Sequence, residues 1–429
     1  MPSRIRVGLY LDTYALMGGQ FQYTLSILEA IQSNSDSFEL IAYCAKEEWI
    51  PICESHRVSI GSFITAQRFL RAVTFLSRKF SPRGVAPKAI AFHGNSFART
   101  LRADLIDVCI FPMPTTLACE VPLPTICSIH DLMYKYESHF PEITGVNSLS
   151  WFQKTYGSIL RYCDTVLVDS VVGKGQILET FSPVHAHIAV LPYCAPLYVR
   201  NNKRKMNEDR DGYEAHISDA VIAATKKRFI FYPAVHGLHK NHKRLLDAVA
   251  LLMHEGIEVN LVLAGTHGQA TPGILSAIEK NVLDTCVTIL PYVSNEELCY
   301  LYSRAQALVM PTFAGPTNIP QLEAFELGCP VLTSRIYGIP DQVGDAAILF
   351  NPNSTQEIAE AIKKIWQHED VRGQLIERGF IRGRELGFDV FAARLKDIIF
   401  QTVNQGESYH SHGCRARRTR NGEPEILWR

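Results

Sequence analysis

MPTFAGPTNIPQLEAFELGCPVLTSRIYGIPDQVGD, residues Met310–Asp345, is the stretch that decides the fold. An apolar run ending at Met310 stops at a loop rich in proline and glycine. A helix-compatible segment then covers Pro320–Leu327, and a second short apolar run covers Pro330–Thr333. This order of strand, loop, helix and strand is typical of a parallel α/β sheet. Ligands of such sheets bind at the carboxyl ends of the strands, where the free N–H groups of a helix start suit phosphate or sugar oxygens.

The same alternation runs along both halves of the chain. In the first half, the apolar run Ile5–Leu11 is followed by a glycine-containing loop and by Phe21–Ile31, whose apolar residues recur at helical spacing. In the second half, Arg228–Ala234 and Lys240–His254 repeat the pattern. Short, continuous apolar runs indicate strands buried on both faces. The sequence therefore predicts an α/β protein with two doubly wound, Rossmann-like parallel-sheet domains that face a cleft.

The domain boundaries that we expect follow changes in amino-acid composition along the chain. We predict an N-terminal domain over residues 1–200 and a linker or surface excursion over the polar stretch 201–225. A C-terminal domain is expected over 226–386, then a helix at 387–404 that packs back on the first domain, then a disordered basic tail at 405–429. Thr65–Phe80 is expected to form an amphipathic helix.

Composition excludes several classes of protein. Lys plus Arg equals Asp plus Glu, 43 each, so charge gives no reason to expect a nucleic-acid partner. The eleven cysteines are scattered, which favours reduced thiols over disulfides or zinc. No apolar run reaches the roughly 18 residues of a membrane span, so a cytoplasmic location is expected. Two interpretations of the basic cluster near Arg415 stay open: a solvated tail, or peripheral contact with anionic lipid at the inner face of a membrane.

Several segments together resemble the family-4 glycosyltransferases (glycosyl transferases group 1) of the GT-B fold, and the resemblance covers roughly Ile5–Val403. In the second half they are FYPAVHGLHKNHKRLL from Phe231, SNEELCYLYSRAQALVMPT from Ser294, GPTNIPQLEAFELGCPV from Gly315 and PDQVGDAAILFNP from Pro340. In the first half they are the glycine pair near residue 18, IHDLMYKYESHFPE from residue 129 and LVDS from residue 167.

The resemblance implies a role for each matching residue. Lys240 matches the lysine that neutralises the diphosphate of a nucleotide-sugar donor, and Glu323 matches the acid that holds the ribose hydroxyls. His130 matches a histidine that faces the transferred sugar. These three are the catalytic candidates. Isolated from the motifs, the same residues have plainer interpretations, as a first-turn lysine, a helix-start carboxylate and a core histidine.

The donor-binding candidates also include residues of two loops. Gly18 and Gly19 match a glycine loop that lets backbone N–H groups approach phosphate, although glycines also make ordinary turns. Thr317, Asn318 and Ile319 would offer N–H groups around the sugar and the β-phosphate. No metal ligand is predicted, because the one Asp-x-Asp pattern, at Asp209, lies in a charged excursion rather than at a strand end.

Two departures from the family pattern stand out. The family commonly has a second glutamate eight residues before the Glu323 position, but residue 315 here is glycine, so Asn318 or backbone groups would have to replace it. The family also often has an arginine shortly before the lysine; none is present here, and His236, His239 or His242 are the candidates to substitute for it.

The resemblance thus implies a retaining, metal-independent transferase that needs no cofactor. It would move a hexose, with mannose one option, from a nucleotide diphosphate sugar to a surface-polysaccharide or lipid-linked glycan. The acceptor is expected near Gly18, Asn95 and Tyr134. Two alternatives remain open: a GT-B nucleotide-sugar epimerase or phosphorylase, and a catalytically degenerate subunit that binds a glycan or a partner enzyme.

Overall fold

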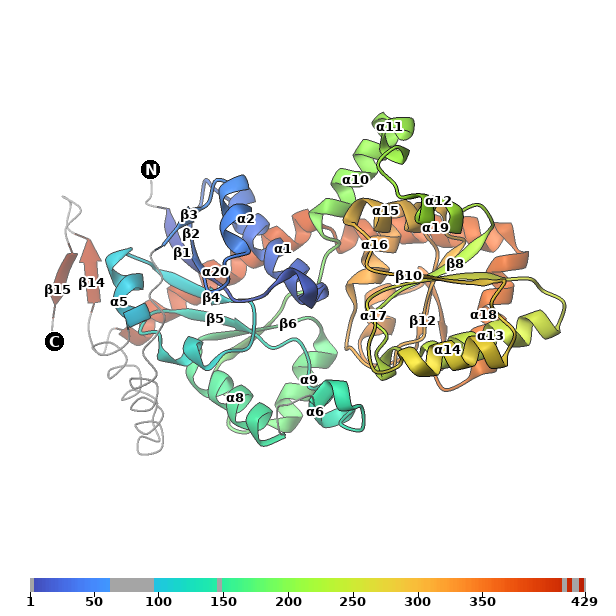
Figure 1. Ribbon diagram of the computed structural model, residues 1–429. Coiled ribbons are helices and arrows are strands. Elements are labelled where there is room, and N and C mark those ends of the chain that lie inside the picture. The colour runs from blue at the N-terminus through green and yellow to red at the C-terminus, as the bar shows by residue number, and fades with distance from the viewer. Residues whose placement is uncertain (1–3, 62–95, 145–148, 411–414, 419–423, 428–429) are drawn as a thin grey trace.

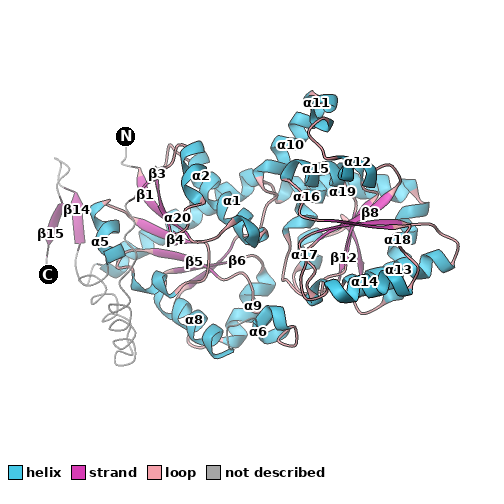
Figure 2. Ribbon diagram, in the orientation of Figure 1, coloured by secondary structure: helices cyan, strands magenta, loops and turns pink. Residues whose placement is uncertain are grey.

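The protein consists of two α/β domains that lie side by side, each with its strands at the centre (Figures 1 and 2). The computed structural model describes residues 4–61, 96–144, 149–410, 415–418 and 424–427 of the 429-residue chain. The predicted fold class, two doubly wound parallel-sheet domains, is confirmed.

The first domain is built on a seven-stranded parallel sheet with the strand order β3-β2-β1-β4-β5-β6-β7. Its strands are β1 Ile5–Leu11, β2 Phe38–Cys44, β3 Ser59–Ile60, β4 Val108–Phe111, β5 Thr125–Ser128, β6 Thr165–Val168 and β7 His187–Val190. The described helices around it are α1 Gly19–Ser33, α2 Trp49–Ser55, α5 Ser96–Ala103, α6 Met133–Tyr136, α7 Pro141–Thr144, α8 Leu149–Tyr162 and α9 Val171–Thr180, with 3-10 turns η1 Ala15–Met17 and η2 Thr116–Glu120.

The second domain holds a six-stranded parallel sheet with the order β10-β9-β8-β11-β12-β13. Its strands are β8 Phe229–Pro233, β9 Asn260–Ala264, β10 Val287–Leu290, β11 Ala307–Met310, β12 Val331–Ser334 and β13 Ala347–Phe350. Its helices are α13 His242–His254, α14 Thr271–Lys280, α15 Asn295–Arg304, α16 Ile319–Leu327, α17 Ile339–Val343, α18 Thr355–Gln367 and α19 Glu369–Glu385, with the 3-10 turn η3 Leu238–Lys240.

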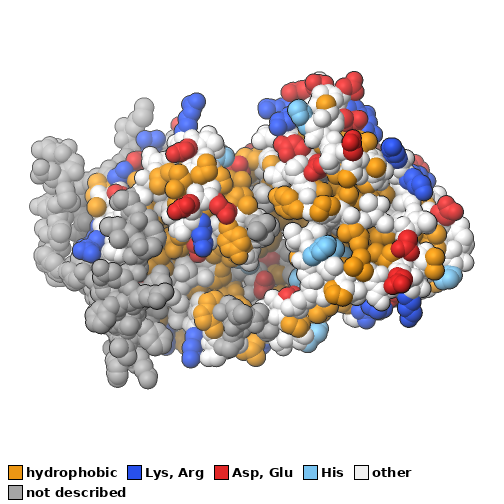
Figure 3. All heavy atoms as spheres, viewed as in Figure 1, with side chains coloured by type: hydrophobic (Ala, Val, Ile, Leu, Met, Phe, Trp, Pro, Cys, Tyr) orange, Lys and Arg blue, Asp and Glu red, His pale blue; other side chains and the backbone are white. Residues whose placement is uncertain are grey.

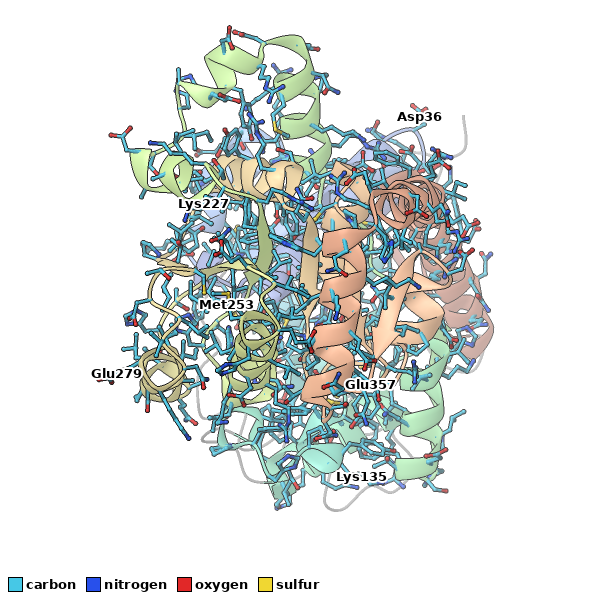
Figure 4. All side chains as sticks on the ribbon, turned by 90° about the vertical axis from the view of Figure 1, so that its right-hand side faces the viewer. Asp36, Lys135, Lys227, Met253, Glu279 and Glu357 are labelled. Carbon is cyan, nitrogen blue, oxygen red and sulfur yellow. The ribbon has the colours of Figure 1, made fainter. Side chains whose placement is uncertain are left out.

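Helices cover both faces of the second sheet (Figure 1). Helices α13, α14 and α18 lie on one face, and α15, α16 and α19 lie on the other. Figure 4 looks onto this domain from the side and shows α14, which carries Glu279, beside α13, which carries Met253. Because both faces are covered, the central strands are buried throughout, as their continuous apolar runs predicted; all four residues of β11 are buried.

Each sheet has one point at which the winding reverses direction. It lies between β1 and β4 in the first domain and between β8 and β11 in the second. Ligands of open α/β sheets bind beside such a point, outside the carboxyl ends of the strands. The loops after β8 and β11, residues 234–241 and 311–318, are therefore the first place to look for a site.

The last long helix, α20 (Phe388–His410), returns from the second domain to the first, where it packs against α1. Phe391, Leu395 and Ile399 are buried in the same apolar cluster as β1 and α1. The Thr402 hydroxyl also hydrogen-bonds the Thr165 hydroxyl at the start of β6, at 2.7 Å. The C-terminal part of the chain thus completes the core of the first domain.

The structure adds detail to two of the expected segments. The polar stretch 201–225 is folded into α10 (Leu197–Glu208), α11 (Arg210–Glu214) and α12 (Asp219–Ala224), which lie on the second domain. Tyr213 and Val221 anchor the stretch because they enter the core of that domain, an arrangement its high charge conceals. In the tail, α20 continues to residue 410, and Arg415–Arg418 pairs antiparallel with Pro424–Leu427. Thr65–Phe80 and Asn95 lie outside the described residues.

Within the described parts of the chain, no helix combines the length and the apolar character needed to cross a membrane. The described cysteines are all free, and all of them except Cys44 are buried.

The packing of α20 yields a stability prediction. Leu395→Ala should lower the free energy of unfolding of the first domain by about 2–5 kcal/mol, because it leaves a cavity at a site 1% exposed. Amide hydrogen exchange should become faster in α1 but not in α16. Ile381→Ala on α19, where the side chain is 52% exposed, is the control and should change stability by less than about 0.5 kcal/mol. Unchanged exchange in α1 would contradict the assignment of α20 to the first core.

Candidate functional site

The candidate site lies where the two domains meet, a recess that Figure 3 shows from one side. Several side chains of the first domain reach loops that follow strands of the second. The Thr317 hydroxyl donates to Asp169, and the Tyr337 hydroxyl donates to Glu137. These contacts join residues 148 and 200 positions apart in the sequence. The predicted cleft between the domains is therefore closed in this structure by polar contacts.

Lys240 lies at the end of η3, in the loop after β8. Burial lowers the pKa of its ammonium group to about 8, while the charge of Asp131 in the first domain raises it. Among the described residues, no hydrogen bond or ion pair to the Lys240 ammonium is found. A mostly buried cation that faces a carboxylate across the cleft without touching it is suited to bind an anion between them.

Asn241 fixes this loop. Its backbone adopts the left-handed conformation, with φ 60°, between η3 and α13. Its side-chain amide donates to the carbonyls of Pro311 and Pro352, both at 2.9 Å. The loop that carries Lys240 is thereby attached to the ends of β11 and β13.

The three histidines near Lys240 do not supply the positive charge of an arginine. Burial lowers the pKa of His239 to about 4 and of His242 to about 3, and it lowers that of His236 as well. All three rings are therefore neutral near pH 7. Arg244, which the sequence analysis did not single out, stacks its guanidinium over Phe313 at 5.2 Å from the ring centroid. It is the arginine nearest in sequence to Lys240.

Glu323 lies in the first turns of α16 and is only 5% exposed. One carboxylate oxygen accepts a hydrogen bond from the Tyr198 hydroxyl at 2.6 Å, and the other accepts one from the Tyr302 hydroxyl at 2.9 Å. Burial raises the pKa of Glu323, while the two tyrosine hydroxyls lower it. The acid is thus held by α10 and α15, and its predicted contact with a ribose stays a prediction.

His130 follows β5 and is half-buried. Nε2 lies 2.9 Å from the carbonyl oxygen of Pro112, so it carries the proton, and Nδ1 accepts from the Tyr193 hydroxyl at 3.0 Å. Burial lowers the pKa of His130 to about 4. The ring is therefore neutral, and both of its nitrogens are engaged in hydrogen bonds.

The glycine loop of the first domain meets the central loop of the second. Gly18 has φ +56°, which favours glycine, at the junction of η1 and α1. A Cβ on Gly19 would stand 3.7 Å from Cδ1 of Ile319. The structure thus brings together two candidate loops that lie 300 residues apart in the sequence.

Asp169 follows β6 and is buried where the domains meet. Its carboxylate accepts hydrogen bonds from the hydroxyls of Thr317 and Ser170. Burial raises its pKa to about 7, the two hydroxyls lower it, and the nearby charge of Asp131 raises it. Thr317 therefore reaches the first domain through its side chain.

Asn318 fills the space beside the residue that departs from the family pattern. Gly315 has φ +105°, and a Cβ there would lie 3.0 Å from the Asn318 side-chain oxygen. Gln342 holds the backbone of Asn318, since it accepts from the N–H at 2.9 Å and donates to the carbonyl at 2.8 Å. The Nδ2 group of Asn318 is buried and has no hydrogen-bond partner among the described residues. The Asn318 N–H is thus occupied, and its side-chain amide is the free donor.

No cluster of three or more His, Cys, Asp or Glu side chains in the described parts of the chain is arranged to hold a metal ion. Asp209 of the Asp-x-Asp pattern instead caps α11, where it accepts from the Gly212 N–H at 2.9 Å.

Several residues of the site could not be identified from the sequence. Tyr198 and Tyr302 reach Glu323 from other helices, and Gln342 reaches Asn318 from α17. Tyr302 and Gln342 lie in segments that resemble the family, but nothing in those segments indicates these contacts. Asp169 did carry a signal, because an acidic residue directly after a buried strand lies at the carboxyl edge of the sheet.

Comparison with known proteins places the second domain in a family. Residues 215–382 match the family model described as glycosyl transferases group 1. The chain is 30% identical over 266 residues to O-antigen chain mannosyltransferase B of Escherichia coli, covering 62% of this chain and 66% of that protein. It is 26% identical over 226 residues to O-antigen chain mannosyltransferase RfbU of Salmonella typhimurium, covering 52% and 58%. The chain thus spans slightly less than two thirds of the length of these relatives.

A solved structure shares the whole architecture. The Anabaena protein Alr3699/HepE, crystallised in complex with UDP and glucose, superposes with a TM-score of 0.66 at 14% identity, over 93% of this chain and all of that one. At that identity the likeness concerns the fold alone. It agrees with the two parallel-sheet domains described above, and the GT-B fold expected from the sequence is confirmed.

The environment of Asp169 predicts a pH dependence. The folded pKa of about 7 exceeds the ordinary value of 3.8, so the native state binds the proton more tightly than the unfolded chain. Stability should therefore fall as the pH rises from about 4 to 7. Asp169→Asn cannot ionise, so its free energy of unfolding relative to the wild type should rise by roughly 2–4 kcal/mol across that window. Urea unfolding at several pH values measures this. Parallel curves for the two proteins would contradict it.

Proposed function

The second domain of this chain belongs to the glycosyl transferases group 1 family, and from that premise we propose that the protein is a retaining, metal-independent glycosyltransferase. It moves a hexose from a nucleotide diphosphate sugar to a surface-polysaccharide or lipid-linked glycan acceptor. The observation that carries this proposal is the partly buried ammonium group of Lys240, which has no hydrogen-bond or ion-pair partner among the described residues and lies beside the switch point of the second sheet.

Lys240 stabilises the leaving nucleoside diphosphate. As the bond between the sugar carbon and the phosphate oxygen breaks, negative charge grows on that oxygen. A cation already held in place lowers the barrier, because it interacts more strongly with the transition state than with the bound donor. The start of α16, with Ile319 as its first residue, adds backbone N–H groups and the positive end of a helix dipole for the same phosphate.

Glu323 takes the ribose hydroxyls in this proposal. The two tyrosines use one lone pair on each carboxylate oxygen, and each oxygen has a second. Tyr198 and Tyr302 would then orient the carboxylate toward the nucleoside.

On the acceptor side, the leaving phosphate removes the proton from the attacking hydroxyl, since His130 is neutral with both ring nitrogens in use. The acceptor oxygen forms a bond to the sugar carbon while the bond to the phosphate oxygen breaks, and the proton passes to that phosphate. The contacts that close the cleft, Thr317 to Asp169 among them, would exclude water during this step.

Mannose is the sugar we propose, because both relatives described above are O-antigen chain mannosyltransferases by name. Their names also support a polysaccharide acceptor. The reaction would then take place in the cytoplasm at the inner face of the membrane, where a lipid-linked acceptor is reached by peripheral contact. No cofactor or metal ion takes part in this proposal.

One alternative has support from a specific observation. Gly315 replaces the expected glutamate, and Glu323 is deeply buried, which are features that a degenerate, non-catalytic subunit could show. Such a subunit would bind a glycan or a partner without turning over a donor. Release of nucleoside diphosphate from a nucleotide sugar separates the two functions.

A ligand panel tests the donor site. One class of nucleotide sugar, UDP-, GDP- or ADP-linked, should raise the thermal unfolding midpoint, because ligand at 100 times its Kd stabilises the native state by about 2.7 kcal/mol. Lys240→Ala should abolish this shift. Lys243→Ala, an exposed lysine paired with Asp247 on the same helix, is the matched control and should keep it. Equal shifts in the wild type and Lys240→Ala would contradict the site, and no shift with any donor would favour the non-catalytic alternative.

Asn318 provides a separate test of how the sugar is recognised. If its free Nδ2 donates to a sugar hydroxyl, Asn318→Ala should weaken binding of the nucleotide sugar by roughly 1–2 kcal/mol and leave the free nucleoside diphosphate unaffected. Isothermal calorimetry with both ligands measures the difference. Thr266→Ala, after β9, is the control. An equal loss for both ligands would show that Asn318 only supports the loop.

A further inference from the structure

One short segment of the first domain contacts three neighbouring loops of the second. Glu137 accepts from the Tyr337 hydroxyl in the loop after β12. Phe140 stacks on Phe313 in the loop after β11, with the ring centroids 5.7 Å apart and the planes 20° apart. Glu142 reaches His239 in the loop after β8. These three loops follow β8, β11 and β12 at the carboxyl edge of the second sheet, so the segment from residue 137 to 142 contacts three loops at the edge where the donor is proposed to bind.

The contact of Glu142 is the most specific of the three. One carboxylate oxygen accepts both the backbone N–H of His239, at 2.7 Å, and its ring Nδ1, at 2.8 Å. The two side chains are 17% and 18% exposed. Burial opposes the charge of Glu142, but the two hydrogen bonds from His239 hold its pKa below the ordinary value. The His239 ring is neutral, so Nδ1 carries the proton that it donates.

His239 directly precedes Lys240 in η3, so the position of one affects the other. The loop is fixed on its far side by Asn241, whose amide bonds two carbonyls within the second domain. On the near side, Gly237 gives room for the contact, because a Cβ there would lie 2.9 Å from the His239 ring and 3.4 Å from Glu142. The near side of the loop is therefore held by a residue of the other domain.

We propose that Glu142 is a positioning residue for the transfer reaction, which holds the loop of Lys240 in its working geometry only when the two domains are closed. The inference rests on the proposed function. When the cleft opens, His239 loses both hydrogen bonds to Glu142, and Lys240 is no longer held opposite Asp131. The position of Lys240 is thereby coupled to domain closure. This coupling lowers the rate at which the donor reacts with water in the open state.

The proposal predicts that loss of the Glu142 contact affects the rate of turnover but not the affinity for the donor. In the proposed function the donor contacts Lys240 and Glu323 of the second domain, so its affinity should depend little on Glu142. The rate of the chemical step depends on the placement of Lys240 in the closed state, so this rate should fall when the contact is lost.

Glu142→Gln tests the proposal, with Glu179→Gln, an exposed carboxylate on α9 of the same domain, as the matched control. Release of nucleoside diphosphate from UDP- and GDP-sugars gives kcat, and calorimetry with UDP and GDP gives Kd. Glu142→Gln should lower kcat by roughly tenfold, the effect of one weakened charge-assisted hydrogen bond. It should change Kd by less than about twofold. Hydrogen exchange in the peptide around residues 237–241 should become faster, while Glu179→Gln changes none of the three.

Other results would overturn the proposal. Tighter nucleotide binding with unchanged kcat would mean that Glu142 blocks the anion site instead of shaping it. An equal loss of kcat in Glu137→Gln, with unchanged exchange around His239 in Glu142→Gln, would mean that the segment only holds the domains together. If the wild type neither binds nor turns over any nucleotide sugar, the proposed function fails, while the exchange experiment still shows whether Glu142 holds the loop.

Discussion

The structure depends on how buried polar groups are paired across the boundary between the two domains. In a parallel sheet the loops and helix starts that bind ligands lie at the carboxyl edge. Here the carboxyl edges of the two sheets face each other. The polar groups of these loops therefore lose contact with water when the domains close. The first domain supplies carboxylates: Asp169 accepts from Thr317, Glu137 from Tyr337 and Glu142 from His239. A buried polar group without a partner would cost a few kcal/mol, so these contacts define one closed arrangement.

Lys240 differs from these paired groups, because no hydrogen bond or ion pair to its ammonium group is found among the described residues. Its pKa falls to about 8 because burial disfavours the charge, and Asp131 offsets only part of that effect. The ammonium group therefore stays charged near pH 7 at a cost in stability. Binding of a donor diphosphate would offset that cost. The burial of Lys240 that lowers the stability of the protein would therefore favour binding of the anion in the proposed reaction.

The sequence was sufficient for the fold because the signals of the fold are local. Continuous apolar runs such as Ala307–Met310 indicate strands covered on both faces, and the motifs around Lys240 and Glu323 lie at strand ends, where the sheet itself places them. The environments of those residues are not local. Tyr198 approaches Glu323 from 125 positions away, and Glu142 approaches His239 from 97. Likewise, the charge of residues 201–225 concealed the few apolar side chains, such as Tyr213, that fold them onto the second domain.

The glycine at position 315 is consistent with the charges that already lie where the two domains meet. Burial raises the pKa of both Asp131 and Asp169, and the charge of Asp131 raises that of Asp169 further. A third carboxylate at position 315, two residues before Thr317, would add negative charge near Asp169. A neutral amide, Asn318, instead occupies the space beside Gly315 and keeps a donor free. The departure from the family pattern therefore replaces a charged acceptor by a neutral donor, and in the proposed function this change would alter which sugar hydroxyls the loop binds.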